Sequence, residues 1–196
     1  MDLAGALALS ERELVSFVGA GGKKTAMRRL VEQGSGDRRV GYTTTTHMPP
    51  PEGIELRIGG PERIQRAMDE EIEPGSPLAF ASERVENPAR VDEKVKGFEP
   101  AAVDTLFGSG VFDWILVKAD GARMREFKAP DLDEPAIPSR STLVVPVVSA
   151  TAIGSVLTEE TVHRPERVAT IAPVAIGELI TPWVVGAVLA SESGGL

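Results

Sequence analysis

The segment Phe17–Met27, FVGAGGKKTAM, contains the residue types that bind phosphate groups. A short apolar run precedes its glycines, and a helix-like pattern follows them. Such a loop directs several backbone N–H groups toward one point, and the helix dipole adds positive potential there. Glycines let the backbone approach a phosphate, and a lysine supplies a mobile charge. A tight glycine turn with surface lysines is the alternative interpretation. The predicted phosphate-binding residues are Gly19, Ala20, Gly21, Gly22 and Lys23.

The residue after Lys23 is unusual for a phosphate loop. A hydroxyl that binds magnesium normally follows the lysine, but here Lys24 follows it, and Thr25 comes one position late. The spacing G-x-x-G-K is shorter than the usual eight-residue loop and is similar to the loop of ATP-dependent Mur-type ligases. Two alternatives stay open. Either Lys23 contacts the phosphate and Lys24 displaces the hydroxyl, or a one-residue bulge makes Lys24 and Thr25 the working pair.

A second motif, TTTTHM at Thr43–Met48, ends a predicted strand. In an open parallel sheet, residues just past the strand ends face the ligand crevice. We therefore predict that Thr45 and Thr46 bind the ligand and that His47 is catalytic. The alternative is that four threonines simply reflect a good strand former.

A third motif spans Val117–Pro138, VKADGARMREFKAPDLDEPAIP. Asp120 follows an apolar strand, as a Walker-B-type carboxylate does, and is a candidate catalytic group. With Thr25 it is also the candidate magnesium ligand. Arg123 and Lys128 add positive charge that suits a second anionic group of the ligand. A solvated, charged loop is the alternative.

Hydrophobic patterning predicts strands that alternate with helices. This alternation favours an α/β fold with a mostly parallel sheet covered by helices on both faces. We expect one nucleotide-binding domain over residues 1–196, with Trp114 and Trp183 in its core. The predicted strands are 14–18, 38–46, 54–60, 77–82, 113–120 and 141–148, and the predicted helices are 25–33, 61–72, 99–107 and 180–190, the last with Thr181 as its cap and Pro182 at its first position.

Composition excludes several classes of function. The chain has 196 residues, no cysteine and a net charge of −8. Disulfides and thiolate metal sites are therefore excluded, and a nonspecific nucleic-acid binder would be basic. No run approaches the ~20 apolar residues of a membrane span, so we expect a cytoplasmic protein without membrane partners. The two histidines and the lack of a G-x-S-x-G elbow argue against a serine hydrolase, and His163 is expected at the surface or as a helix cap.

Together, the three motifs in this order resemble the YqeC family, described as accessory proteins of selenium-dependent hydroxylases. The resemblance implies a P-loop NTPase-like fold that binds ATP or GTP. It also implies a role in maturing molybdenum- and selenium-dependent hydroxylases, with such a hydroxylase as client. The family pattern G-A-G-G-K-T, T-T-T-T-x-M, E-A-D-G and K-A-P…E-P…I-P stands here at Gly19–Lys23, Thr43–Met48, Ala119–Gly121, Lys128–Pro130 and Glu134–Pro138, and the segments KGFEPAAVDTL and VHRPERV (Val162–Val168) also match.

Two lysines depart from this pattern. Lys24 replaces the hydroxyl residue of the loop, and Lys118 replaces the glutamate of E-A-D-G. These are the positions of the usual magnesium contacts, so we hypothesise that the two lysines take the electrostatic role of the metal. Side chains alternate along a strand, which predicts Lys118 and Asp120 on one face. In the alternative, Lys118 points away and Asp120 alone holds magnesium through water.

The resemblance also concerns the end of the chain. Family members continue into a further strand that ends near an N-K-x-D-like segment, whereas this sequence stops at Leu196. If that segment reads the base, we expect these contacts to be missing and the protein to be less selective for purine type. The alternative is that the chain is a shortened version. Three functions stay open. One is a nucleotide-binding accessory protein that hydrolyses a nucleoside triphosphate or transfers a phosphoryl or nucleotidyl group. The second is a non-catalytic carrier of a phosphorylated cofactor such as a pterin, and the third is a structural adaptor.

Overall fold

The computed structural model describes residues 1–73, 75–85 and 93–193. They form two compact units. Gly194–Leu196, the last residues of the sequence, lie outside the described residues. The first unit comprises Met1–Ser16, Lys24–Ala119 and Ala136–Val144, and the second comprises Phe17–Lys23, Asp120–Pro135 and Val145–Leu196.

The main sheet has six strands, in the order β10-β1-β8-β2-β5-β4. The pairs β2–β8, β2–β5 and β4–β5 are all parallel, so the predicted mostly parallel sheet is confirmed. Apolar runs form its centre, because β2, β5 and β8 are buried along their whole length. The six strands are β1 (Glu13–Gly19), β2 (Val40–Thr44), β4 (Glu55–Ile58), β5 (Leu78–Ala81), β8 (Trp114–Lys118) and β10 (Leu143–Val147).

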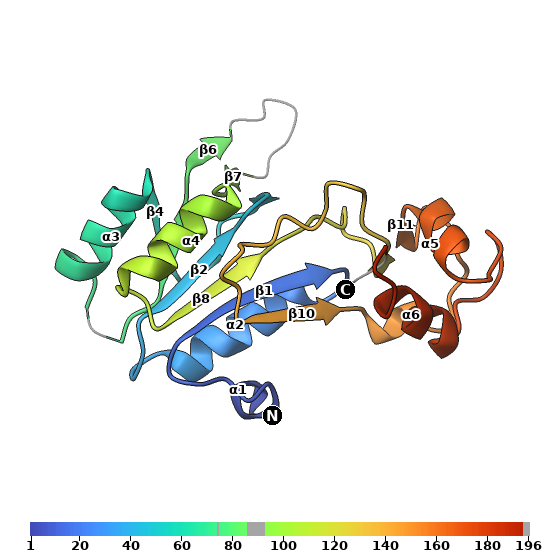
Figure 1. Ribbon diagram of the computed structural model, residues 1–196, viewed down its shortest axis with the longest axis horizontal. Coiled ribbons are helices and arrows are strands. Elements are labelled where there is room, and N and C mark those ends of the chain that lie inside the picture. The colour runs from blue at the N-terminus through green and yellow to red at the C-terminus, as the bar shows by residue number, and fades with distance from the viewer. Residues whose placement is uncertain (74, 86–92, 194–196) are drawn as a thin grey trace. The chain divides into compact units, whose positions relative to one another are not determined.

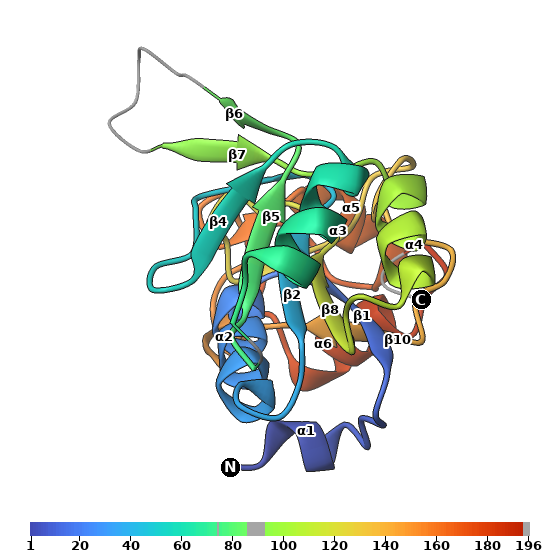
Figure 2. The same ribbon diagram turned by 90° about the vertical axis from the view of Figure 1, so that its left-hand side faces the viewer.

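Helices cover both faces of the sheet in the first unit (Figures 1 and 2). Helix α2 (Lys23–Gly34) lies on one face, where a Cβ atom at Gly34 would touch Val40 and Trp114. Helices α3 (Pro61–Glu70) and α4 (Pro100–Ser109) pack together on the other face. Both begin with proline at the first position, as predicted for α3, whereas α4 begins one residue after its predicted start at position 99. A short helix, α1 (Leu3–Ala6), precedes β1.

A small antiparallel sheet was not predicted. It has the order β3-β7-β6, formed by β3 (His47–Met48), β6 (Glu83–Val85) and β7 (Lys94–Lys96). Strand β2 ends at Thr44, two residues before the predicted end of this strand at Thr46. His47 and Met48 instead pair with Lys96 and Val95 of β7. The threonine run thus turns from one sheet into another.

The second unit has its own apolar core. Strands β9 (Phe127–Lys128) and β11 (Val162–His163) pair in parallel. A 3-10 turn, η1 (Ala150–Ala152), and helices α5 (Pro165–Ile171) and α6 (Pro182–Leu189) complete it. The buried residues of this core are Phe127, Ala129, Ala152, Leu157, Val162, Val168, Ala172, Val174, Ile180, Val184, Val185 and Val188.

Three local predictions can be compared with the structure. Thr181 caps α6, because its hydroxyl accepts a hydrogen bond from the Val184 N–H. Trp114 is buried, but the prediction for Trp183 is wrong, since this side chain is 59% exposed. Helix α6 is apolar on nearly every side, so its sequence does not mark which face is buried. In the described part of the chain, no helix is long and apolar enough to cross a membrane.

Candidate functional site

The predicted phosphate loop joins β1 to α2 through a left-handed backbone. Gly19, Gly21 and Gly22 have φ values of 91°, 68° and 105°, which favour glycine. A Cβ atom at Gly19 would overlap the carbonyl oxygen of Val147. One at Gly21 would lie 2.5 Å from the Cβ of Ser149. All three glycines are therefore favoured by conformation, and Gly19 and Gly21 are also required by close packing against the end of β10 and Ser149.

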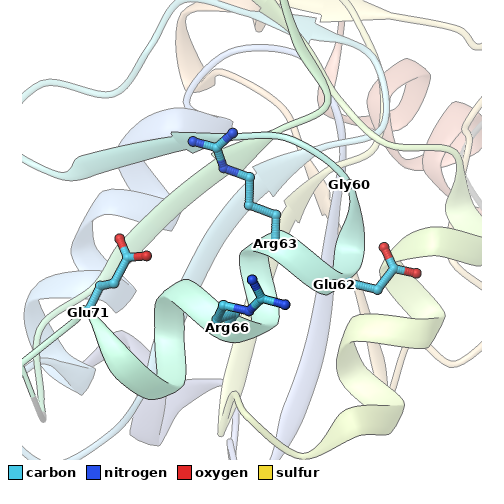
Figure 3. Close-up of a pocket in the computed structure, with 5 residues that line it drawn as sticks. All are labelled: Gly60, Glu62, Arg63, Arg66 and Glu71. Atoms are coloured by element: carbon cyan, nitrogen blue, oxygen red, sulfur yellow. The ribbon is translucent and has the colours of Figure 1, made fainter.

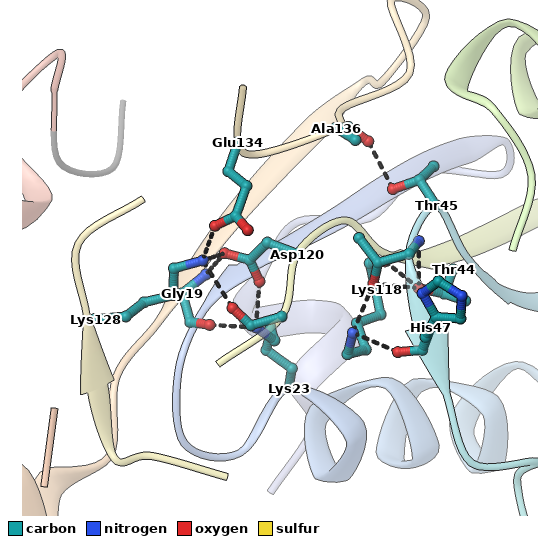
Figure 4. Close-up of polar contacts among 12 residues, drawn as sticks. Gly19, Lys23, Thr44, Thr45, His47, Lys118, Asp120, Lys128, Glu134 and Ala136 are labelled. Carbon is teal, nitrogen blue, oxygen red and sulfur yellow. Dashed lines mark hydrogen bonds and ion pairs between the residues drawn. The ribbon is translucent and has the colours of Figure 1, made fainter. Parts of the chain in front are cut away.

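Lys23 occupies the inside of this loop. Its ammonium donates hydrogen bonds to the Gly19 carbonyl and to Asp120 Oδ1, and its side chain is only 6% exposed (Figure 4). Burial lowers the pKa of the Lys23 ammonium, and the Asp120 carboxylate offsets only part of that effect. A lysine at the first position of a helix thus points back into the loop, as a phosphate-binding lysine would.

Two amides of the loop already have acceptors. The Gly19 N–H donates to Asp120 Oδ2 at 2.8 Å, and the Ala20 N–H donates to the Val147 carbonyl at 2.8 Å. The cavity beside Gly19 and Asp120 has a volume of only about 10 Å³, about the size of one water molecule. Two amides of the loop and the Lys23 ammonium are therefore already paired within the protein.

Asp120 is the centre of a buried group of charges. It is 1% exposed and follows β8, as predicted. Besides Lys23 and the Gly19 amide, it binds Lys128, whose Nζ lies 3.0 Å from Asp120 Oδ2. The same ammonium donates to Glu134 Oε2 at 2.6 Å and to the Gly121 carbonyl at 2.8 Å. Lys128 is thus surrounded by three oxygen atoms.

From Glu134 the charges alternate in sign toward the surface. Arg164 donates to both oxygens of Glu134, at 2.9 and 3.3 Å. Burial alone would raise the pKa of Glu134, but the hydrogen bonds and charges of Arg164 and Lys128 lower it to about 2. Arg164 also lies 3.4 Å from Asp131, which in turn pairs with Arg167 at 3.5 Å. Glu134 is therefore ionised throughout the ordinary pH range.

Lys24 and Thr25 lie exposed in the first turn of α2. The helix begins at Lys23, and it is Lys23 whose ammonium enters the loop. This geometry fits the first of the two alternatives, in which Lys23 is the inward lysine. The sequence pattern had left that choice open, because side-chain direction at a helix start depends on where the helix begins.

The threonines after β2 form a separate polar group in the first unit (Figure 4). The Lys118 ammonium donates to Thr46 Oγ1 at 2.9 Å and to the His47 carbonyl at 3.1 Å. Thr45 Oγ1 donates to the Ala136 carbonyl at 2.7 Å. The His47 side chain is exposed. Strand β8 ends at Lys118, so strand alternation does not extend to Asp120, and the prediction that the two share a face stays a prediction.

Two further predicted residues have different surroundings in the second unit. Arg123 is exposed and has a positive φ of 46°. Lys128, predicted as its partner in binding an anion, is buried against carboxylates instead.

His163 ends β11, and the N-cap position of α5 belongs to Arg164, so the helix-cap alternative for this histidine is wrong. Burial and the charges of Arg164, Lys128 and Arg123 lower the pKa of His163.

Magnesium does not fit the surroundings of Asp120. Its Oδ1 accepts from Lys23, and its Oδ2 accepts from Gly19 and faces Lys128. A divalent cation there would lie beside two buried ammonium groups, whose repulsion it would have to overcome. Among the described residues, no cluster of three or more His, Cys, Asp or Glu side chains could hold a metal ion.

A larger hollow lies in the first unit, on the outer side of α3 (Figure 3). Its volume is about 540 Å³. Arg63, Arg66, Glu62 and Glu71 line it, and all four are exposed. Figure 3 shows these side chains spread along the helix, without a common point of convergence.

Comparison with known proteins agrees with the three motifs. The family model described as YqeC protein matches residues 15–166. The chain is also 38% identical over 162 residues to "Uncharacterized protein YqeC" of Escherichia coli (strain K12), an alignment that covers 81% of this chain and 60% of that protein. The chain thus spans less than two thirds of the length of this relative. No solved structure matches significantly. The matched region includes the glycine loop, the threonine motif and the segment around Asp120, and the chain belongs to the YqeC family.

Proposed function

We propose that the protein binds a nucleoside triphosphate, ATP or GTP, through a P-loop-like cradle formed by Gly19–Lys23 and the start of α2. The observation that carries this proposal is Lys23, a buried lysine at the first position of a helix. Its ammonium lies inside a loop of left-handed glycines and is held by Asp120. The first N–H groups of a helix have no partner within the helix and attract anions.

Binding requires Lys23 to exchange partners. In the ligand-free loop its ammonium neutralises Asp120, and a triphosphate offers several negative charges within the reach of the same side chain. Asp120 keeps Lys128 and the Gly19 amide after this exchange. The carboxylate is therefore not left unpaired when Lys23 turns to the phosphates, which keeps the cost of the movement small.

The wider role is taken from the family resemblance. We propose an accessory protein in the maturation of a molybdenum- or selenium-dependent hydroxylase, which would be its client. Asp120 and His47 stay proposed as catalytic groups for hydrolysis, or for transfer of a phosphoryl or nucleotidyl group, and Thr45 and Thr46 stay proposed as ligand contacts. Arg123 stays proposed as a contact to a second anionic group.

A second function is favoured by the surroundings of Asp120. Its oxygens already bind two ammonium groups and an amide, and in phosphoryl transfer a metal ion supplies much of the catalysis. A non-catalytic carrier of a phosphorylated cofactor needs no metal. Phosphate release from ATP and GTP separates the two functions, since only the first predicts turnover.

Calorimetric titration with ATP and GTP tests the cradle. We expect Lys23→Met to weaken binding about tenfold or more, because a hydrogen bond to a charged group contributes about 1.5–3 kcal/mol. Lys24→Met is the matched control. It removes the same charge one position later, from an exposed side chain, and we expect a change of less than about threefold. If wild-type protein binds neither nucleotide, or if both variants lose affinity equally, the proposed cradle is wrong.

A further inference from the structure

We propose that the ammonium of Lys128 is a built-in replacement for the divalent cation of a nucleotide site, held in a cage of Asp120, Glu134 and the Gly121 carbonyl. This inference deepens the proposed function and rests on it for its biological meaning. The cage itself is a property of the chain, and a metal alone can test it.

The geometry around Lys128 resembles the surroundings of a bound metal ion. Three oxygen atoms surround its Nζ, at 3.0 Å from Asp120 Oδ2, 2.6 Å from Glu134 Oε2 and 2.8 Å from the Gly121 carbonyl. Carboxylate and carbonyl oxygens are the ligands that magnesium, calcium and manganese prefer. The distances are those of charge-assisted hydrogen bonds, so the cage fits an ammonium group.

The burial of this lysine supports the assignment. Its side chain is 1% exposed, and lysines are almost never fully buried unless they are paired. Lys128 presents its charge to three oxygen atoms of the protein, as a resident cation does.

The position of the cage gives it a role in ligand binding. Asp120 bridges the two lysines, because Oδ1 accepts from Lys23 and Oδ2 faces Lys128. When Lys23 turns to a phosphate, Lys128 remains to neutralise Asp120. Lys128 thus acts as a positioning residue that keeps the carboxylate charged and fixed without a metal. Nucleotide binding should then be independent of magnesium.

Direct metal binding provides the first test. The protein is titrated with Mn²⁺, and electron paramagnetic resonance measures the concentration of free ion. In wild type we expect no Mn²⁺ site that is lost in the Asp120→Asn variant. Lys128→Ala should gain one Mn²⁺ site, and the double variant Lys128→Ala/Asp120→Asn should lose it again. Lys96→Ala, which removes an exposed lysine of β7, is the charge-matched control and should gain none.

Three results would overturn the inference. One is a wild-type Mn²⁺ site that depends on Asp120. Another is a folded Lys128→Ala variant that binds no more Mn²⁺ than wild type. Circular dichroism melting shows whether the variant is folded, and Lys128→Met, which keeps the apolar stem, replaces it where it is not. The third is ATP affinity of wild type that rises more than tenfold when EDTA is replaced by magnesium.

The two proposals can fail separately. If wild type binds no nucleotide, the proposed function is wrong, and the Mn²⁺ titrations still decide whether Lys128 occupies a cation cage. If nucleotide binds equally well with EDTA and with magnesium but Lys128→Ala gains no Mn²⁺ site, the cradle stands and the cage is wrong.

Discussion

The loop after β1 and the outer side of α3 both contain charged side chains, but they hold them in opposite ways. At the loop, Lys23, Asp120 and Lys128 are at most 6% exposed, and both ammonium groups pair with Asp120. The cavity beside Asp120 and Lys128 has a volume of only about 10 Å³. On α3, exposed arginines and glutamates line a hollow of about 540 Å³.

This difference favours the loop over the larger hollow as the candidate site. Exposed charges are screened by solvent and gain little from pairing. Buried charges carry a large desolvation cost, and each one must be paired. A chain that keeps two lysines buried on one aspartate therefore has them in a specific arrangement, whereas the α3 side chains can be changed at little cost.

The largest effect is expected for Asp120→Asn. Removing this charge leaves two buried ammonium groups without their shared carboxylate, and breaking a buried pair typically costs about 3–5 kcal/mol. Glu62→Gln on α3 is the control, with an expected loss of about 0.5 kcal/mol because it lies exposed in the first helical turn. Urea unfolding measures both. A loss below about 1 kcal/mol for Asp120→Asn would mean that the loop charges are no more coupled than those of α3.

The pH dependence of stability sharpens the same comparison. The pKa of Glu134 is about 2, against an ordinary value of 4.5. A lowered pKa in the folded state stabilises the protein above pH 4.5, and that stability is lost as the pH falls toward 2. It corresponds to about 3 kcal/mol at most.

Urea unfolding of wild type and Glu134→Gln between pH 7 and pH 2 measures this contribution. We expect the difference in unfolding free energy to shrink steadily below pH 4.5. Glu62→Gln should show a small difference that hardly changes over the range. A Glu134→Gln difference that is the same at pH 6 and at pH 2.5 would show that Arg164 and Lys128 do not hold this carboxylate as the structure describes.

A pair of glycine variants separates close packing from backbone strain. Gly21 and Gly53 both have a positive φ, 68° and 72°. A Cβ atom at Gly21 would lie 2.5 Å from the Cβ of Ser149, whereas one at Gly53 would meet nothing within 4 Å. Gly53→Ala should cost only the strain, about 1 kcal/mol, and Gly21→Ala about 1–3 kcal/mol more. Equal losses in urea unfolding would mean that the loop does not pack against Ser149.

The sequence predicted the framework well, because local signals encode it. Apolar runs such as the one at Trp114–Lys118 indicate buried strands, and proline at a helix start indicates where α3 begins. The lysine and aspartate of the site could also be found from their places at a helix start and after a strand. These signals depend only on neighbours in the sequence.

The partners within the site could not be predicted in the same way. From the sequence, Lys128 was predicted to bind an anionic group of the ligand, but its ammonium pairs with Asp120 and Glu134. These two carboxylates lie in irregular segments, which have no periodic sequence pattern from which the pairing could be predicted. Arg164 lies 30 residues from its partner Glu134 and was not singled out. The matching segment VHRPERV was the available signal, and it gave no indication of the ion pair.

The smallest effect is expected for Arg63→Gln and Arg66→Gln, made singly and together. Both arginines are exposed, so each change should alter the unfolding free energy by less than about 0.5 kcal/mol. ATP affinity, measured by calorimetry, should change by less than about twofold, because neither guanidinium faces a buried carboxylate or a closed loop. The contrary outcome is informative. Suppose that the double variant loses ATP affinity tenfold while Lys23→Met binds ATP as tightly as wild type. The nucleotide site would then lie at α3, and the buried charges at the loop would have only a structural role.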